Sequence, residues 1–124
     1  MTAPVLSSKN FDKEFTVQTD ASDIGIAGIL SQKDENNDEY VVASFSKKLT
    51  KAERKYTVTE RECLAILKSV EKFRPYIDLQ HFNVITDHCS LLWLLNLKDP
   101  SGRLSRWALK LQQYSFNIEH RKGK

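Results

Sequence analysis

The chain has 124 residues, of which 40% are hydrophobic and 28% are charged, and its formal net charge is +3. This composition is typical of one globular domain and excludes a disordered chain. No apolar run reaches the ~20 residues that span a bilayer, and the N-terminus lacks the pattern of a secretory signal. We therefore expect an intracellular protein (cytoplasm, virus-like particle or nucleus) with no membrane partner. The modest positive charge permits a polyanionic partner without requiring one.

The first half of the chain is predicted to be a strand meander. After an extended lead-in over residues 1–13, the alternation in FTVQTDASDIGIAGIL predicts a hairpin over 15–30 with its turn at Ser22–Asp23. A polar turn over 33–39 then leads to a β-branched and aromatic strand over 40–46. Glycines in the second strand indicate places where the backbone approaches another group closely.

The second half changes to helical spacing. Apolar residues at i, i+3, i+4 and i+7 predict the longest helix over 57–74, which Pro75 should end. The remaining expected elements follow in the order strand, helix, helix and strand: 81–87, 89–97, 103–114 and 115–120. The order βββαβααβ predicts an α/β domain, with a mixed sheet and helices packed on it.

Three carboxylates occupy positions that do not suit ordinary surface charges. Asp20 ends the first expected strand, although Asp is depleted in strands. Asp87 ends the fourth strand, where open α/β sheets place their sites. Glu62 begins the apolar stripe of the long helix. Each has a structural alternative, since Asp20 could begin an Asx-type turn and Asp87 could cap the next helix. The coincidence of three such carboxylates favours a metal site.

Two glutamates compete for the role of third ligand. Glu60 and Glu62 lie about 200° apart around the helix, so they cannot face the same way. Thr57-x-x-Glu60 fits a capping box, which gives Glu60 a structural role. Thr59-x-x-Glu62 fits a capping box too, so capping remains an alternative for Glu62.

Three motifs carry a resemblance to a known family. TDAS (19–22), TERECLAI (59–66) and ITDH (85–88) resemble the ribonuclease H domain of gypsy-like LTR retrotransposon reverse transcriptases. Four further stretches are similar to the same family: TAPVL near the start, FSKKLTKAERKYTVTE (45–60), KFRPY (72–76) and RLSRWALKLQQYSFNIEHRKGK (103–124). The resemblance covers nearly the whole chain in unbroken order, which makes it more specific than any single motif.

The resemblance implies a fold, a domain division and a function. The expected fold is the ribonuclease H-like α/β fold, with a five-stranded mixed sheet ordered 3-2-1-4-5 and flanked by helices. Residues 1–13 would end the connection region of the reverse transcriptase, and 14–124 would form the ribonuclease H-like domain. The implied activity is endonucleolytic hydrolysis of RNA in RNA–DNA hybrids. The implied partners are that hybrid and the polymerase and connection domains of the parent polyprotein.

The resemblance also implies a metal site. Asp20, Glu62 and Asp87 match three of the family's catalytic, metal-binding carboxylates. Mg²⁺ prefers such oxygen ligands, two Mg²⁺ ions would be expected with a complete site, and Mn²⁺ could substitute. The family has a fourth Asp on a last helix, which this sequence, ending at Lys124, is expected to lack. The alternative function is therefore a catalytically impaired or domesticated module that binds nucleic acid or protein.

Several residues are candidates for substrate contact. A run of cations before the long helix could follow a phosphate backbone, or could simply be a solvated surface. That run consists of Lys47, Lys48, Lys51, Arg54 and Lys55. The residues expected to contact nucleic acid are Ala21, Ser22, Lys51, Arg54, Tyr56 and Arg61. Trp93 and Trp107 are expected to pack in the core, and Cys63 and Cys89 to be free buried thiols.

Overall fold

The computed structural model describes residues 13–78, 80–86 and 102–121. In this part of the chain, five strands form one mixed sheet in the order β3-β2-β1-β4-β5, which confirms the expected order. The strands are β1 (Phe15–Ala21), β2 (Gly25–Lys33), β3 (Glu39–Lys48), β4 (Phe82–Thr86) and β5 (Phe116–His120). The helices are the 3₁₀ helix η1 (Glu53–Lys55), α1 (Val58–Lys72), α2 (Arg74–Ile77) and α4 (Gly102–Leu111). The expected helix over 89–97 lies outside the described residues.

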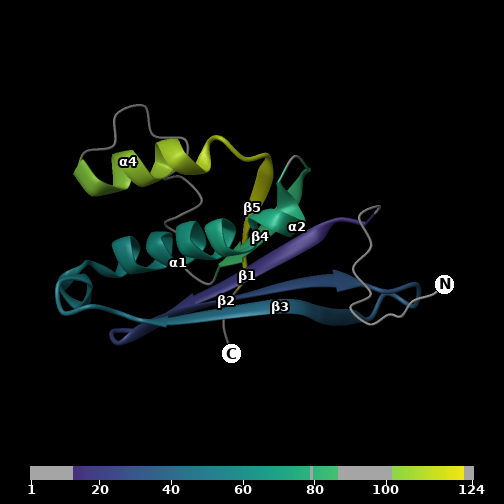
Figure 1. The fold of residues 1–124 in the computed structure, drawn as a ribbon, viewed down its shortest axis with the longest axis horizontal. Helices are drawn as coiled ribbons and strands as arrows, with labels where there is room; N and C mark the ends of the chain where they lie inside the picture. Colours follow the sequence, from purple (N-terminus) through teal and green to yellow (C-terminus); the bar gives the residue numbers. More distant parts are fainter. Residues whose placement is uncertain (1–12, 79, 87–101, 122–124) are drawn as a thin grey trace.

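The helices α1 and α4 lie over the same face of the sheet, with α1 next to it (Figure 1). The alternation of buried and exposed residues along β1 agrees with this arrangement. Phe15, Val17 and Thr19 are buried on the face that α1 covers, whereas Gln18 and Asp20 are exposed on the other face. That other face is called the open face below.

Strand β1 is the centre of the sheet and pairs differently on its two sides. It is antiparallel to β2 along its length and parallel to β4. The pairing with β4 runs from Phe15 opposite Phe82 to Gln18 opposite Ile85. The last pair within the described residues therefore lies two residues before Asp20.

Helix α1 begins as its sequence predicts. Thr57 is the N-cap, and the reciprocal hydrogen bonds between Thr57 and Glu60 complete the expected capping box. The helix ends at Lys72, close to the expected boundary. Pro75 does not simply stop it, because this proline lies in the first turn of α2, a position that needs no amide hydrogen.

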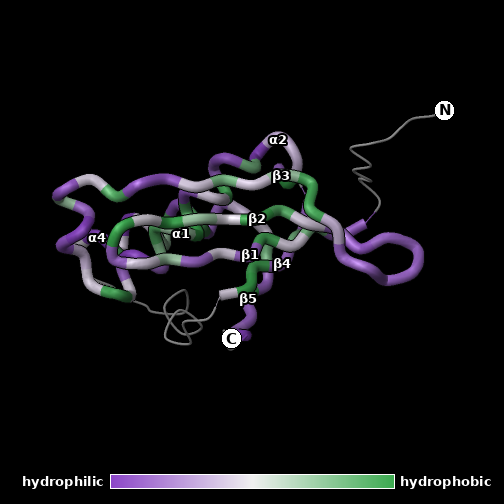
Figure 2. The backbone as a smooth tube through the Cα atoms, turned by 90° about the horizontal axis from the view of Figure 1, so that it is seen from below, coloured by the Kyte–Doolittle hydropathy of each residue, from purple (hydrophilic) through white to green (hydrophobic). Residues whose placement is uncertain are grey.

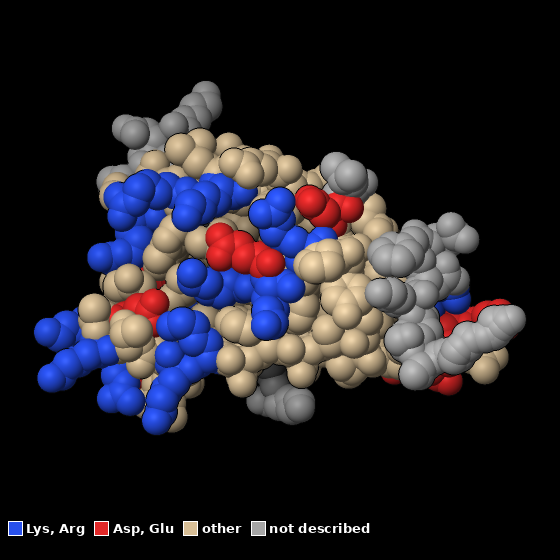
Figure 3. Space-filling model, in the orientation of Figure 1, with Lys and Arg blue, Asp and Glu red and all other residues tan. Residues whose placement is uncertain are grey.

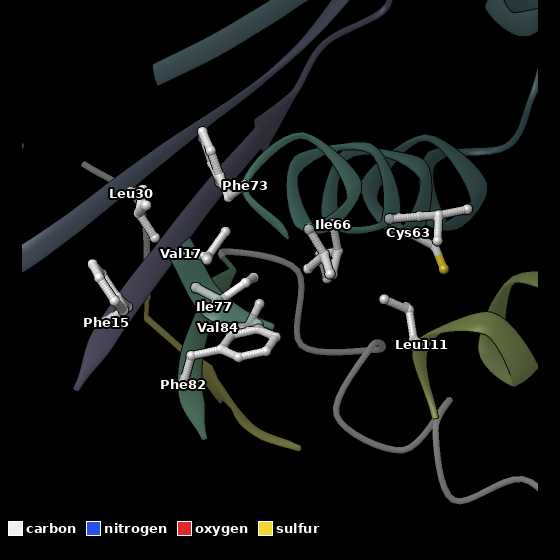
Figure 4. Close-up of a cluster of buried hydrophobic side chains, with 12 residues drawn as sticks. Phe15, Val17, Leu30, Cys63, Ile66, Phe73, Ile77, Phe82, Val84 and Leu111 are labelled. Carbon is white, nitrogen blue, oxygen red and sulfur yellow. The ribbon is translucent and has the colours of Figure 1, made fainter. Parts of the chain in front are cut away.

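The main core lies between α1 and the sheet (Figure 4). Its buried members include Phe15, Val17, Leu30, Cys63, Ile66, Leu67, Val70, Phe73, Ile77, Phe82, Val84 and Leu111. Close packing at Gly28 draws α1 onto β2, because a Cβ there would lie 2.0 Å from Ser69 Oγ. This confirms the expectation that Gly28 marks a close approach. Cys63 is a free buried thiol, as expected, whereas Cys89 lies outside the described residues.

The last helix packs on α1 and the core through one apolar face. Ala108 and Leu111 are buried, and Leu104 and Trp107 pack against the core from its edge. The connection between β2 and β3, by contrast, is the hydrophilic loop that projects at one end of the tube (Figure 2). None of the helices in the described ranges is both long and apolar enough to cross a bilayer.

Candidate metal and nucleic-acid site

Topology brings Asp20 and Glu62 to one end of the sheet. Strand β3 runs in the same direction as β1 and leads through η1 into α1. Helix α1 therefore starts near the end of β1, and it runs back over the sheet (Figure 1). Asp20 is the second-last residue of β1, and Glu62 lies in the second turn of α1. This is the carboxyl-terminal edge of the two parallel strands, where open α/β sheets bind ligands.

Asp20 has an exposed side chain on the open face, and its Oδ1 accepts a hydrogen bond of 3.0 Å from the Ala21 amide. The turn that follows is made by Ser22, whose Oγ accepts hydrogen bonds from the Ile24 and Gly25 amides at 3.2 and 3.1 Å. The alternative in which Asp20 begins an Asx-type turn is therefore wrong. Ser22, predicted to contact nucleic acid, also holds this turn.

Glu62 is only 6% exposed although it carries a carboxylate. The alternative in which Thr59 and Glu62 form a capping box is wrong, because the helix begins two residues earlier, with Thr57 as its N-cap. One turn further along the same face, Ala65 belongs to a buried cluster with Ala21 packed against it. A buried carboxylate is costly unless hydrogen bonds, an opposite charge or a metal ion compensate it.

The two carboxylates approach the end of the sheet from opposite sides. Asp20 lies on the open face, and Glu62 lies on the buried side of α1. Asp87, the third predicted ligand, lies outside the described residues. Within the described ranges, no group of three acidic, histidine or cysteine side chains is suited to hold a metal ion. As a donor set, two carboxylates fit a hard cation such as Mg²⁺ better than zinc or copper.

A shallow hollow of about 420 Å³ opens beside Asp20 on the sheet. The residues around it are Asp20, Ala21, Ser22, Ile24, Gly25, Ile26, Ala27, Ser46, Lys47 and Lys48. Two residues predicted to contact nucleic acid, Ala21 and Ser22, are therefore next to the candidate metal ligand. Lys47 and Lys48, two of the cations that could follow a phosphate backbone, line its other side. The strand β3 that carries them continues to Lys48, beyond the expected end at Ser46.

The other predicted nucleic-acid contacts lie around the start of α1. Lys51 and Arg54 are exposed, as a phosphate contact requires. Arg61 instead donates from Nη1 to the Tyr56 carbonyl at 3.0 Å, and reaches the Arg54 carbonyl at 3.5 Å. The structure thus brings Arg54, Tyr56 and Arg61 together, and Arg61 holds the loop that precedes the helix.

Tyr56 packs against α4. Its ring lies 4.1 Å below the Arg103 guanidinium and 5.7 Å from the Trp107 ring. A base that stacked on Tyr56 would therefore have to displace the Arg103 guanidinium from the ring. The expectation that Trp107 packs inside the protein is confirmed by its contact with both core clusters.

Two lysines of the run before α1, Lys47 and Lys48, lie on opposite faces of β3. Lys47 forms an ion pair of 2.7 Å with Glu53, on the side of the helices. Partial burial acts to raise the pKa of Glu53, but hydrogen bonds from Lys47 and Thr50 and the Lys47 charge outweigh it and lower that pKa. Lys48 is exposed and, by alternation from Phe45, lies on the open face.

Positive charge is concentrated at the same end of the molecule. Figure 3 shows Lys and Arg side chains gathered where η1, the start of α1 and α4 lie in Figure 1. The sign of this surface suits a phosphate backbone.

Comparison with known proteins connects this geometry to a family. Residues 10–114 match the family model of the RNase H-like domain found in reverse transcriptase. The Transposon Tf2-3 polyprotein of Schizosaccharomyces pombe is 39% identical over 124 aligned positions, which cover 97% of this chain and 9% of the polyprotein. The chain thus spans less than a tenth of that relative.

Solved structures share the fold at low identity. The foamy viral protease-reverse transcriptase in complex with an RNA/DNA hybrid has a TM-score of 0.68 and 19% identity, covering 94% of this chain and 16% of that chain. LC11-RNase H1 in complex with an RNA/DNA hybrid has a TM-score of 0.66 and 14% identity, covering 88% and 86%. These similarities show a ribonuclease H fold.

Proposed function

Because the chain belongs to the family of RNase H-like domains found in reverse transcriptases, with Tf2 transposon polyproteins among its relatives, we propose that it hydrolyses RNA in RNA–DNA hybrids. The reaction would be an endonucleolytic, divalent-metal-dependent cleavage. The site would be the carboxyl-terminal edge of β1 and β4, with Asp20, Glu62 and Asp87 as the catalytic carboxylates.

The observation that carries the proposal is that Asp20, exposed near the end of β1, and Glu62, buried in the second turn of α1, lie at the same end of the sheet. Asp20 is the second-last residue of β1, and Ala21, which ends the strand, packs against the cluster that contains Ala65 of α1. An exposed carboxylate from the open face and a buried one from α1 can therefore act on one cation. Asp87 follows Thr86, the last residue of β4, directly in the sequence.

We assign Asp20 and Glu62 different roles because one is exposed and the other is buried. Asp20, which is exposed, would meet the cation together with the substrate phosphate. Glu62 would bind the cation from the side of α1, where the burial of its carboxylate limits competition from water. When bound, Mg²⁺ or Mn²⁺ would supply charge stabilisation and would activate water as the nucleophile. The remaining surface would recognise the hybrid by its shape and by its phosphates, without reading sequence.

The proposed partners follow from the relatives. The Tf2 relatives are polyproteins of which this chain matches 9%. We therefore propose that the chain works as the ribonuclease H module of a retrotransposon polyprotein, beside its polymerase and connection domains, and inside the cell. The foamy viral and LC11 proteins were solved with an RNA/DNA hybrid, which supports the same substrate class for this chain.

Cleavage of a labelled hybrid in Mg²⁺ or Mn²⁺ tests the proposal. Asp20→Asn and Glu62→Gln should each abolish cleavage while leaving the fold intact. Glu60→Gln is the matched control, since it makes the same chemical change two residues from Glu62 on another side of the helix. It should retain cleavage.

Two outcomes would count against this function. Cleavage that survives both Asp20→Asn and Glu62→Gln would remove these residues from the catalytic site. Hybrid binding by the unmodified protein without cleavage in either metal would instead favour a nucleic-acid-binding module. Calorimetric titration of Mn²⁺ provides a separate measurement, because Glu62→Gln should weaken metal binding and Glu60→Gln should not.

A further inference from the structure

The hollow beside Asp20 has the features of a second phosphate subsite. Its floor is made by Gly25 and Ala27, two small residues on the open face of β2. Its far wall is made by Ser46 and Lys48, from the open face of β3. The hollow therefore places a cation and a hydroxyl opposite the candidate metal ligand.

The register of the sheet determines how these residues face each other. Asp20 is opposite Ala27, which is opposite Ser46, so the three form one row across β1, β2 and β3. Gly25 is opposite Lys48 in the next row on the same face. Two strand spacings, about 10 Å, separate the Asp20 backbone from that of Ser46. Lys48 is thus placed to contact a different group of the same polymer from the one at Asp20.

The charge of Lys48 is available for this purpose. The ion pairs formed by the described residues include Lys47 with Glu53, but none involves Lys48. Its side chain is exposed, and the small residues beneath it leave room for a bulky anion. A Cβ at Gly25 would lie 3.2 Å from the Lys47 carbonyl, so a larger residue there would crowd the neighbouring strand β3.

We propose that Lys48, assisted by the Ser46 hydroxyl, binds a non-scissile phosphate of the RNA strand in this hollow. The contact positions the strand so that the neighbouring, scissile phosphate reaches Asp20. This subsite rests on the proposed function, since it assumes that the scissile phosphate is held at Asp20. Lys48 is a positioning residue and takes no part in the chemical step.

Binding of an RNA–DNA hybrid, with divalent metal chelated so that no cleavage occurs, tests the subsite. Lys48→Ala should weaken binding about three- to fivefold and reduce the slope of log Kd against log salt concentration by about 1. Lys33→Ala is the matched control, since Lys33 is an exposed lysine at the opposite end of β2. It should change binding less than twofold.

A hybrid with one neutral methylphosphonate in its RNA strand locates the contact. Moved along the strand, the methylphosphonate should weaken binding of the unmodified protein at one position near the cleavage site. Lys48→Ala should lose that position-specific effect, because the charge that reads the phosphate is gone. Ala27→Val, which fills the floor with a side chain favoured in strands, should weaken binding although every charge is retained.

The outcomes separate this inference from the proposed function. Equal effects of Lys48→Ala and Lys33→Ala, or a methylphosphonate effect that persists in Lys48→Ala, would overturn the subsite while hybrid cleavage still stood. Failure of the unmodified protein to bind or cleave hybrids would overturn the proposed function, and the subsite with it.

Discussion

Arg103, in the first turn of α4, donates a hydrogen bond of 3.0 Å to Glu60 in α1. The other carboxylate oxygen of Glu60 accepts from the Thr57 amide and completes the capping box. One side chain therefore caps the helix that carries Glu62 and also attaches α4 to it. The candidate site and the last helix share a structural support.

Glu60→Ala should destabilise the protein by about 1–2 kcal/mol, because it removes half of the capping box and the Arg103 contact together. Glu60→Gln should cost less, since an amide oxygen can still accept from the Thr57 amide. Urea unfolding of both variants, with and without Arg103→Met, measures the coupling. An Arg103→Met effect that is equally large in the Glu60→Ala background would show that the two residues do not interact.

Gly28→Ala should destabilise by about 2–3 kcal/mol, because its Cβ would lie 2.0 Å from Ser69 Oγ and 2.7 Å from Ser69 Cβ. The cost should shrink when Ser69 is changed to Gly. Gly25→Ala is the matched control on the open face, where the nearest atom is 3.2 Å away. Thermal unfolding measures the stability of Gly28→Ala, of its combination with Ser69→Gly, and of Gly25→Ala. A loss of stability in Gly28→Ala no greater than that in Gly25→Ala would contradict the close packing.

Ser69→Ala should be neutral or stabilising by up to about 1 kcal/mol. The Ser69 hydroxyl is buried and has no hydrogen-bond partner in the described part of the chain. Alanine removes that hydroxyl and is also the better helix former. Denaturant midpoints compare the variant with the unmodified protein. A loss above 1 kcal/mol would mean that the hydroxyl makes an important hydrogen bond.

Cys63 should resist thiol reagents in the folded protein. It is 1% exposed, and burial raises the pKa of its thiol from 9.0 to about 12. In a Cys89→Ser background, labelling should occur only on unfolding. The unfolded thiol ionises first, so the stability contributed by the protonated thiol is complete below pH 9 and is lost as the pH rises towards 12. Rapid labelling at pH 8 without denaturant would contradict this burial.

Lys47→Met should destabilise by about 0.5–1.5 kcal/mol at pH 7, through loss of the hydrogen-bonded pair with Glu53. The pKa of Glu53 is lowered from its ordinary 4.5, so the pair is complete above that pH and is lost as the pH falls through the folded-state pKa. The difference between variant and unmodified protein should therefore disappear in acid. Lys48→Met, on the open face, should show no such pH dependence.

Local patterns were the reliable part of the sequence. Alternation over 15–30 predicted the hairpin of β1 and β2, and the capping box with Thr57 placed the start of α1. Both depend on neighbours within a few residues, which a sequence displays directly. The sheet order came from the family resemblance, because strand order depends on contacts between distant residues.

Features that depend on tertiary contacts were missed. Strand β2 continues past the expected hairpin over 15–30 to Lys33, and after a bulge at Leu30 it buries Gln32. Gln32 then donates to the Lys13 carbonyl at 3.0 Å and accepts from Tyr40 at 3.1 Å. A buried, hydrogen-bonded Gln interrupts the apolar alternation, so the pattern suggested a turn. The Tyr56 contact with α4 was equally invisible, since Arg103 lies far along the chain.

The parallel pairing of β1 and β4 has a consequence for how the chain folds during synthesis. Strands β1 to β3 and helix α1 are consecutive in the sequence, so the part that holds Asp20 and Glu62 relies on short-range contacts. Strand β4 must return to pair Phe82 beside Phe15. Until β4 has left the ribosome, one edge of β1 offers unpaired amides and carbonyls. Such an edge invites aggregation, so the nascent chain is most vulnerable just before its second half emerges.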